Sequence, residues 1–198
     1  MSARLPLAAP AVAVTLALVA AGCGGGANHS TASNAVSPNG REVSPPGDIP
    51  DNQVFVRYSP PRARYSVRVP EGWARVSSAG AVTFTDKLNS VRMASRPVTA
   101  APTTASVRRG LPAFARSIHG FASGRVSTVN RHAGTAVRLT YLADSGADPV
   151  TGKVHTDAVE RYLFFHNGTE VDLTLSGPKG ADNVDPWRIV TESLRWTR

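Results

Sequence analysis

The sequence predicts an α+β domain in which helices pack against a β-sheet that contains antiparallel hairpins. Three observations lead to this prediction. Apolar and polar residues alternate over several runs within residues 54–198, which is the pattern of strands. Two of these runs flank Asn167-Gly168, a strong hairpin signal because both positions of its turn need a positive φ. Two further segments, 104–118 and 185–196, carry apolar residues at helical spacing.

The remaining strands follow from the same alternation. In "ARYSVRVPEGW", we expect Tyr65, Val67 and Val69 to point into the interior. The runs "AVTFTD" and "SVRMASRPV" predict a second hairpin that turns at residues 87–89. The run "GTAVRLTYLAD" at 134–144 alternates over most of its length, and we expect it to be a central strand.

The hairpin around Asn167-Gly168 also predicts its own register. A two-residue turn places Phe164 opposite Val171 and Tyr162 opposite Leu173, all four on one face. The other face carries apolar and charged side chains together: Leu163, Phe165, Glu170 and Asp172, with Arg161 diagonal to Asp172. Because bulky apolar residues stand on both faces, we expect both to be covered, which favours helices packed against the sheet.

The first predicted helix lies within residues 104–118, where apolar residues share one face: Val107, Leu111, Phe114, Ala115 and Ile118. Pro112 interrupts this pattern and leaves two alternatives. The helix begins near Leu111 with Pro112 in its first turn, or a longer helix begins at Thr104 and kinks at Pro112.

The second predicted helix is near the C-terminus. Asp185 is a good N-cap residue, and Pro186 after it suits the first helical position. Trp187, Val190 and Leu194 then line one side. We expect both helices to cover the sheet.

The chain has a single cysteine, Cys23, and what precedes it is typical of an export signal. Arg4 stands before an apolar run at residues 5–21, which is shorter than the roughly 20 residues of a spanning helix. The letters "VAAGC" resemble the lipobox of bacterial lipoproteins, with Ala20 where Leu is usual. The resemblance implies that residues 1–22 are a cleaved signal peptide and that the Cys23 thiol receives a diacylglyceryl group.

Two alternatives to lipidation remain open, an uncleaved membrane anchor and a signal peptide cleaved at another bond. A core position for Cys23 is disfavoured, because the glycines at 24–26 cannot build a core around it. A lipid anchor predicts a protein held at the outer, extracytoplasmic face of the cell membrane, since two or more acyl chains bind stably. The absence of other cysteines fits an exported domain large enough to need no disulfide.

Residues 23–53 are predicted to be a flexible tether after the lipidated cysteine. They are rich in Gly, Ser, Asn and Pro, and they cannot bury enough apolar surface to offset the entropy of ordering. The alternative is that the proline-rich end, residues 45–50, packs on the domain as an ordered arm. Residues 54–198 are then one domain, long enough to bury about two-thirds of its surface.

Several segments of this domain resemble the PsbP family and its relatives: "YSVRVPEGW", "VRLTYL", "VERYLFFHNGTEVDLTLSGP" and "DPWRIVTESLRW". These relatives include actinobacterial lipoproteins of unknown role and the Ran-binding Mog proteins. The resemblance covers nearly all of residues 54–198 and implies a PsbP-like α-β-α sandwich, in which a central antiparallel β-sheet lies between helices. It also implies an accessory protein that docks on other proteins. No catalytic residue of the family matches a position of this chain.

No motif of the sequence predicts catalysis, a cofactor or a metal. The five histidines, at 29, 119, 132, 155 and 166, lack the spacing of a helical metal pair. Asp144, Asp148 and Asp157 lie around a loop at 143–153, but they lack the ligand spacing of a calcium-binding loop, so a polar hairpin loop is favoured. Ser176 in "TLSGP" does not match the nucleophile elbow of hydrolases.

The formal net charge of +8 bears on the choice of partner. A basic surface on a tethered protein is attracted to anionic lipid headgroups or wall polymers over about a Debye length. Nucleic acid is the other partner of basic proteins, but an exported location argues against it, and the arginines form no dense run.

Three hypotheses for the function remain, ranked here from the most to the least favoured. The first is a non-enzymatic accessory module that docks on another envelope protein, which predicts exposed apolar surface. The second is a lipid- or small-ligand-binding lipoprotein, which predicts a pocket between sheet and helix. The third is an envelope hydrolase, which predicts a nucleophile, a base and an orienting acid in one cleft.

Overall fold

The computed structural model describes residues 46–148 and 150–197. The elements follow one another in this order: β1 (Phe55–Tyr58), β2 (Tyr65–Pro70), β3 (Ala74–Ser78), β4 (Ala81–Asp86), β5 (Asn89–Pro97), α1 (Thr104–Ser117), β6 (Ala122–Arg131), β7 (Gly134–Asp144), β8 (Thr156–His166), β9 (Thr169–Pro178), α2 (Val184–Glu192) and β10 (Arg195–Trp196). A seven-stranded sheet has the order β3-β4-β5-β9-β8-β7-β6, and a three-stranded sheet has the order β1-β2-β10. Neighbouring strands are antiparallel, so the predicted α+β class is confirmed.

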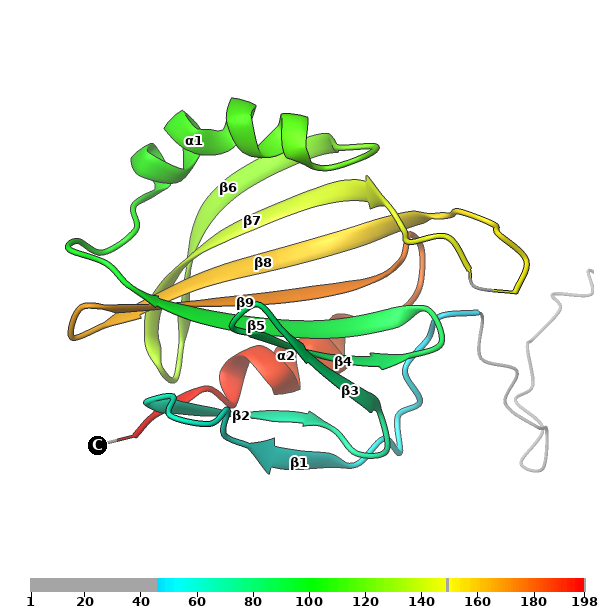
Figure 1. Ribbon diagram of the computed structural model, residues 1–198, viewed down its shortest axis with the longest axis horizontal. Coiled ribbons are helices and arrows are strands. Elements are labelled where there is room, and N and C mark those ends of the chain that lie inside the picture. The colour runs from blue at the N-terminus through cyan, green and yellow to red at the C-terminus, as the bar shows by residue number, and fades with distance from the viewer. Residues whose placement is uncertain (1–45, 149, 198) are drawn as a thin grey trace, which may run out of the picture. The chain divides into compact units, whose positions relative to one another are not determined.

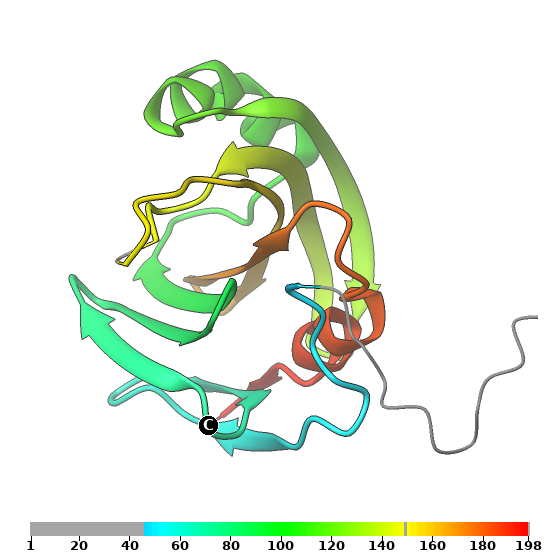
Figure 2. The same ribbon diagram turned by 90° about the vertical axis from the view of Figure 1, so that its right-hand side faces the viewer.

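The large sheet lies between two layers (Figure 1). Helix α1 covers one face, and α2 with the small sheet covers the other. Figure 2 shows that the large sheet is strongly curved. The main core lies on the α2 side, where strand residues such as Leu173 and Leu175 meet Trp187, Val190 and Leu194. A second cluster lies under α1 and contains Val126, Val137, Leu139, Tyr141, Ala143, Val159 and Leu163.

The β8–β9 hairpin has the predicted register. Tyr162 pairs with Leu173 and Phe164 with Val171, and all four side chains are buried in the main core. The turn residues Asn167 and Gly168 have φ angles of 45° and 74°, which is the reason that Asn-Gly stands there. The second predicted hairpin, β4–β5, is also present.

Helix α1 decides between the two alternatives for Pro112. It is one helix from Thr104 to Ser117 with Pro112 inside it. The N-cap residue Thr103 explains the early start, because Thr103 and Ser106 form a reciprocal capping box. The apolar face predicted from spacing packs on the second cluster.

Helix α2 begins one residue before the predicted N-cap, so the prediction for Asp185 is wrong. Its N-cap is Asn183, whose side chain makes no capping hydrogen bond. That side chain is used elsewhere: its Oδ1 accepts from the Ile49 amide at 2.8 Å, and its Nδ2 donates to the Gly47 carbonyl at 3.0 Å. Asp185 remains in the first turn, where a carboxylate is favourable.

Other differences concern the positions of two predicted strands and four strands that were not predicted. Strand β7 lies next to the edge strand β6, so the central position predicted for it is wrong; β9 occupies the middle of the order. Strand β2, with the expected inward residues, belongs to the small sheet. Strands β1, β3, β6 and β10 were not predicted, because two are very short, β3 is fully exposed and β6 is mostly exposed.

The N-terminal predictions lie largely outside the described residues. Cys23, the signal peptide at 1–22 and the tether as far as residue 45 are among these. Residues 46–53 pack on the domain, because Ile49 is buried in the main core and the Gly47 carbonyl accepts from Asn89 Nδ2 at 2.8 Å. In the part of the chain that the structure describes, no helix has the length and apolar character to cross a membrane.

Candidate functional site

A groove of about 390 Å³ lies between α1 and the exposed half of the large sheet. Its walls come from α1, from the segment that leads into α1, and from strands β5, β7, β8 and β9. We call it the α1 groove, and its lining is Arg96, Val98, Ala100, Ala101, Pro102, Ser106, Val107, Gly110, Leu111, Phe114, Leu139, Arg161, Leu163 and Glu170. It arises because α1 covers β6 to β8 and leaves the neighbouring strands uncovered.

One wall of the groove is apolar. No residue of α1 is fully buried, although Val107, Leu111 and Phe114 pack against the second cluster. Phe114 meets Tyr141 edge to face, with ring centroids 5.5 Å apart. Burial raises the pKa of the Tyr141 phenol above its ordinary value of 10.0, so this ring stays neutral and serves as packing.

The opposite wall is charged, and its charges are paired. Arg161 donates from Nε and a terminal nitrogen to Asp172 Oδ2, at 2.9 and 2.6 Å. Its guanidinium also lies over the Phe114 ring, 4.8 Å from the centroid. Burial opposes the charge of Arg161, but the hydrogen bonds and charge of Asp172 outweigh it, and the pKa of the guanidinium rises above its ordinary value.

A second ion pair lies where β5 ends and β9 begins. Arg96 donates from Nε to Glu170 Oε1 at 2.9 Å, and its terminal nitrogen lies 2.8 Å from the same oxygen. The Glu170 side chain is 5% exposed, whereas that of Arg96 is 68% exposed. The guanidinium therefore presents free N–H donors to solvent at the mouth of the groove.

This arrangement is suited to binding rather than to covalent chemistry. Apolar side chains face a row of charged groups, so an amphipathic partner satisfies both walls. Ser106 supplies the hydroxyl group of the groove lining, and the lining contains no histidine or cysteine. Ser106 Oγ already donates to the Thr103 carbonyl and accepts from the Thr103 amide, so it caps the helix.

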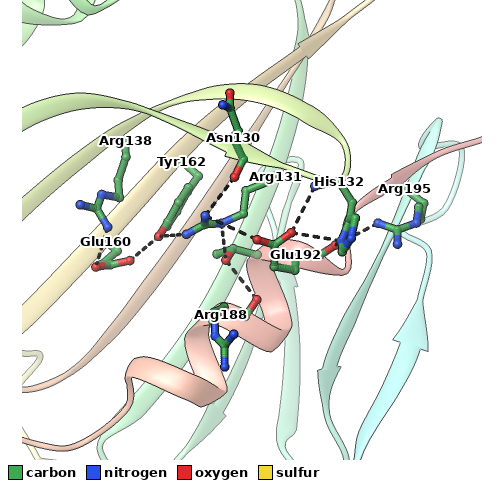
Figure 3. Close-up of polar contacts among 10 residues, drawn as sticks. Asn130, Arg131, His132, Arg138, Glu160, Tyr162, Arg188, Glu192 and Arg195 are labelled. Carbon is green, nitrogen blue, oxygen red and sulfur yellow. Dashed lines mark hydrogen bonds and ion pairs between the residues drawn. The ribbon is translucent and has the colours of Figure 1, made fainter.

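A second hollow, the α2 pocket, lies on the other side of the sheet and measures about 280 Å³. It is lined by side chains of β6, β7, β8 and α2, among them Arg138, Glu160, Tyr162 and Arg188. Figure 3 shows how its polar groups connect. The Tyr162 hydroxyl donates to Glu160, and Arg138 lies 3.6 Å from the same carboxylate. Burial, and then the contact with Glu160, raises the pKa of Tyr162, which keeps the donor proton in place.

Arg131 joins this pocket to α2. Its Nε donates to Thr191 Oγ1 at 3.1 Å, and its terminal nitrogens lie 3.4 Å from the Tyr162 hydroxyl and 3.5 Å from a Glu192 oxygen. Two buried N–H donors here, Arg138 Nε and Trp187 Nε1, have no protein partner among the described residues. Ordered water is the usual partner of such groups. The network holds α2 against the sheet.

The structure brings together a serine, a histidine and an aspartate that no sequence motif connects. Ser145 Oγ lies 3.0 Å from His155 Nδ1, and His155 Nε2 lies 2.9 Å from Asp157 Oδ1 without hydrogen-bond alignment. The Ser145 hydroxyl donates to the Gly146 carbonyl and accepts from the His155 amide. These bonds close the loop between β7 and β8, and none of the three residues lines the α1 groove.

The other sequence candidates lie apart. Asp148 accepts from the amides of Val150 and Thr151, and these hydrogen bonds lower the pKa of its carboxyl, as expected of a polar loop. His119 contacts Asp144, and His132 contacts Glu192. Within residues 46–148 and 150–197, no three His, Asp or Glu side chains are arranged to hold a metal ion. Cys23 lies outside the described residues.

The fold is similar to that of several solved structures. Cyanobacterial PsbP (CyanoP) from Synechocystis sp. PCC 6803 matches at 16% identity and a TM-score of 0.51, over 76% of this chain and 98% of that chain. The Ran-binding protein Mog1p from Saccharomyces cerevisiae matches at 9% identity and 0.48, over 73% and 96%. LpqN from Mycobacterium tuberculosis, which is involved in cell envelope biogenesis, matches at 16% and 0.46, over 74% and 91%.

A further matching protein, from Bacteroides thetaiotaomicron VPI-5482, is 14% identical over 72% of this chain, with a TM-score of 0.49. The chain spans about half, 48%, of the length of that protein. No family model matches the sequence, and no curated protein matches it. The likeness to CyanoP at this identity concerns the fold alone. The chain therefore has a PsbP-like α+β fold, as the segments of its sequence predicted.

Proposed function

We propose that this protein is a non-enzymatic accessory module of the cell envelope and that another envelope protein docks in its α1 groove. On this proposal, Cys23 carries the diacylglyceryl group that holds the protein at the extracytoplasmic face of the membrane. Residues 23–53 connect the anchor to the domain 54–198, and residues 46–53, the last part of this segment, pack on the domain.

The observation that carries this proposal is the incompletely covered apolar face of α1. The helix has 14 residues, and none of them is fully buried. Val107, Leu111 and Phe114 turn apolar atoms toward the groove as well as toward the sheet. Apolar surface that a folded domain leaves open marks interaction sites, and the paired charges opposite supply directional hydrogen bonds.

A second candidate function is the binding of a small amphipathic ligand, such as a lipid, in the same groove. The volume of about 390 Å³ favours it, since pockets for small molecules measure roughly 300–1,000 Å³. The two walls match an acyl chain on the α1 side and a polar group beside Arg96 on the sheet side. The occupant of the groove therefore distinguishes the two functions.

Site-specific crosslinking in intact cells tests both. Gly110 lines the groove, and a Cβ built on it meets no heavy atom within 4 Å, so a photoreactive side chain fits there. Ala113 is exposed on the same helix but does not line the groove, and it is the matched control position. We expect crosslinking from position 110 to recover one stoichiometric envelope protein and crosslinking from position 113 to recover much less.

A steric block provides the complementary measurement. Gly110→Trp fills the groove, whereas Ala113→Trp adds the same side chain away from it. We expect only Gly110→Trp to abolish co-purification of the partner from intact cells. Recovery of a bound lipid from position 110, with no protein, supports the second candidate. Equal crosslinking from both positions, or a partner that survives Gly110→Trp, contradicts the assignment of the groove.

A further inference from the structure

Three arginines from the three strands of the small sheet line one shallow hollow beside the C-terminal end of α2. Arg57 is on β1, Arg68 on β2 and Arg195 on β10, and the hollow measures about 250 Å³. Arg57 and Arg68 are directly opposite each other in the β1–β2 pair. All three side chains are exposed. We call this feature the arginine hollow.

The charges of the arginine hollow are not balanced by carboxylates. Arg57 donates to the Ser66 hydroxyl at 2.8 Å, and Arg195 donates to the main-chain carbonyls of Glu192 and Leu194, each at 2.9 Å. Among the described residues, none of the three arginines forms an ion pair. This differs from the α1 groove, where each guanidinium has a carboxylate partner.

The one carboxylate that lines the hollow is already in use. Glu192 Oε1 lies 3.5 Å from a terminal nitrogen of Arg131, whereas Glu192 Oε2 accepts from the His132 amide at 3.2 Å and lies 3.0 Å from His132 Nδ1. Figure 3 shows Glu192 between Arg131 and His132, with Arg195 beyond. Three guanidiniums therefore face one shared carboxylate, and the hollow keeps a positive excess.

Like charges directly opposite in an antiparallel pair are unfavourable for the fold itself. Guanidinium groups bind phosphate oxygens through their planar fork of N–H donors, so a phosphate group in the hollow relieves this repulsion. The hollow also contains Ile189, an apolar side chain that is 41% exposed. Cations beside an exposed aliphatic side chain match the headgroup region of a membrane, where phosphates lie next to hydrocarbon.

We propose that the arginine hollow binds the phosphodiester of an anionic phospholipid headgroup and that it presents the small sheet to the membrane surface. The proposal does not rest on the lipid anchor or on the function of the α1 groove. Arg57, Arg68 and Arg195 hold the phosphate, and Ile189 contacts the adjoining hydrocarbon.

The test measures how strongly the full chain prefers anionic vesicles. All proteins carry Cys23→Ser, which prevents acylation. The readout is the partition coefficient for phosphatidylglycerol-containing vesicles divided by that for pure phosphatidylcholine vesicles. An apolar contribution from the N-terminus affects both partition coefficients equally and cancels in this ratio. The variant Arg57→Gln/Arg68→Gln/Arg195→Gln is compared with Arg109→Gln/Arg116→Gln/Arg125→Gln, which removes three exposed arginines outside the hollow. Circular dichroism and thermal unfolding establish that each variant is folded.

We expect the hollow variant to lower the ratio at least roughly tenfold and the control variant to lower it less than about threefold. Equal losses in both variants overturn the proposal, because they show attraction to net charge alone. Sodium phosphate at constant ionic strength and a purified phosphodiester wall polymer are tested on the same proteins. Binding of either one through the three arginines, with no vesicle preference, overturns the lipid headgroup as the source of the phosphate.

Discussion

The ion pair between Arg161 and Asp172 permits a quantitative prediction about the wall of the α1 groove. The two side chains are 23% and 17% exposed, so both charges have lost most of their water. Asp172→Ala leaves the guanidinium without its two short hydrogen bonds and partly buried over Phe114. Breaking a fully buried pair costs about 3–5 kcal/mol, and the remaining exposure places this loss at about 3 kcal/mol.

A double-mutant cycle separates the pair from the other effects of the substitutions. Arg161→Met leaves a carboxylate that still accepts from Thr174 Oγ1 at 2.9 Å, and we expect a cost of about 2 kcal/mol. The double variant has no buried charge left and is expected to cost about 3 kcal/mol. The difference gives a coupling energy of about 2 kcal/mol between the two side chains.

Urea unfolding followed by tryptophan fluorescence measures these values, since the chain has three tryptophans. In a domain of this size, each kcal/mol corresponds to roughly 2–4 °C in Tm, so Asp172→Ala is expected to melt about 6–12 °C lower. A coupling energy below about 0.5 kcal/mol would refute the reasoning, because it would mean that the pair behaves as a solvated surface contact.

Three further predictions concern other parts of the chain. Cys23→Ser is expected to move the protein from the membrane fraction to the medium, and intact-mass analysis of the wild type is expected to show the diacylglyceryl group; a free thiol there would exclude the anchor. Gly168→Ala is expected to cost about 1 kcal/mol in urea unfolding, because φ at this turn position is 74°; an unchanged midpoint would mean that the turn rearranges without cost. Burial raises the pKa of Asp157 above its ordinary value of 3.8, so the protonated form favours the fold and stability falls as the pH rises through the folded pKa. The stability of Asp157→Asn relative to wild type is therefore expected to rise between pH 3 and neutral pH, by an amount that corresponds to the titration of one group. A stability difference that stays constant across this range would contradict the raised pKa of Asp157.

The parts of the fold that the sequence predicted are those fixed by local chemistry. The β8–β9 register follows from two turn residues and a two-residue period, and it is correct at Tyr162–Leu173 and Phe164–Val171. The apolar face of α1 follows in the same way from helical spacing. Such features need no knowledge of distant segments, because neighbouring residues determine them.

Features that depend on distant segments were not predictable in this way. The start of α2 differs because the Asn183 side chain binds Ile49 and Gly47, which are more than 130 positions earlier. Strand β3 has no buried residue, so no alternation marks it. A pocket between sheet and helix was expected only on the hypothesis of a lipid- or small-ligand-binding protein. The contact of Arg96 with Glu170 in the α1 groove depends on the β5–β9 pairing, which places these two residues opposite each other.

The α1 groove and the arginine hollow differ in whether carboxylates neutralise their arginines, and this difference determines which partner each surface can bind. In the α1 groove, Arg161 and Arg96 each face a carboxylate, so the groove has little net charge to attract an ion and its selectivity depends on apolar fit. In the arginine hollow, neither Arg57 nor Arg68 forms an ion pair with a carboxylate among the described residues, so an anion gains charge-assisted hydrogen bonds without displacing an existing ion pair. Salt should therefore weaken binding at the hollow much more than binding at the groove, because only the hollow relies on uncompensated charge.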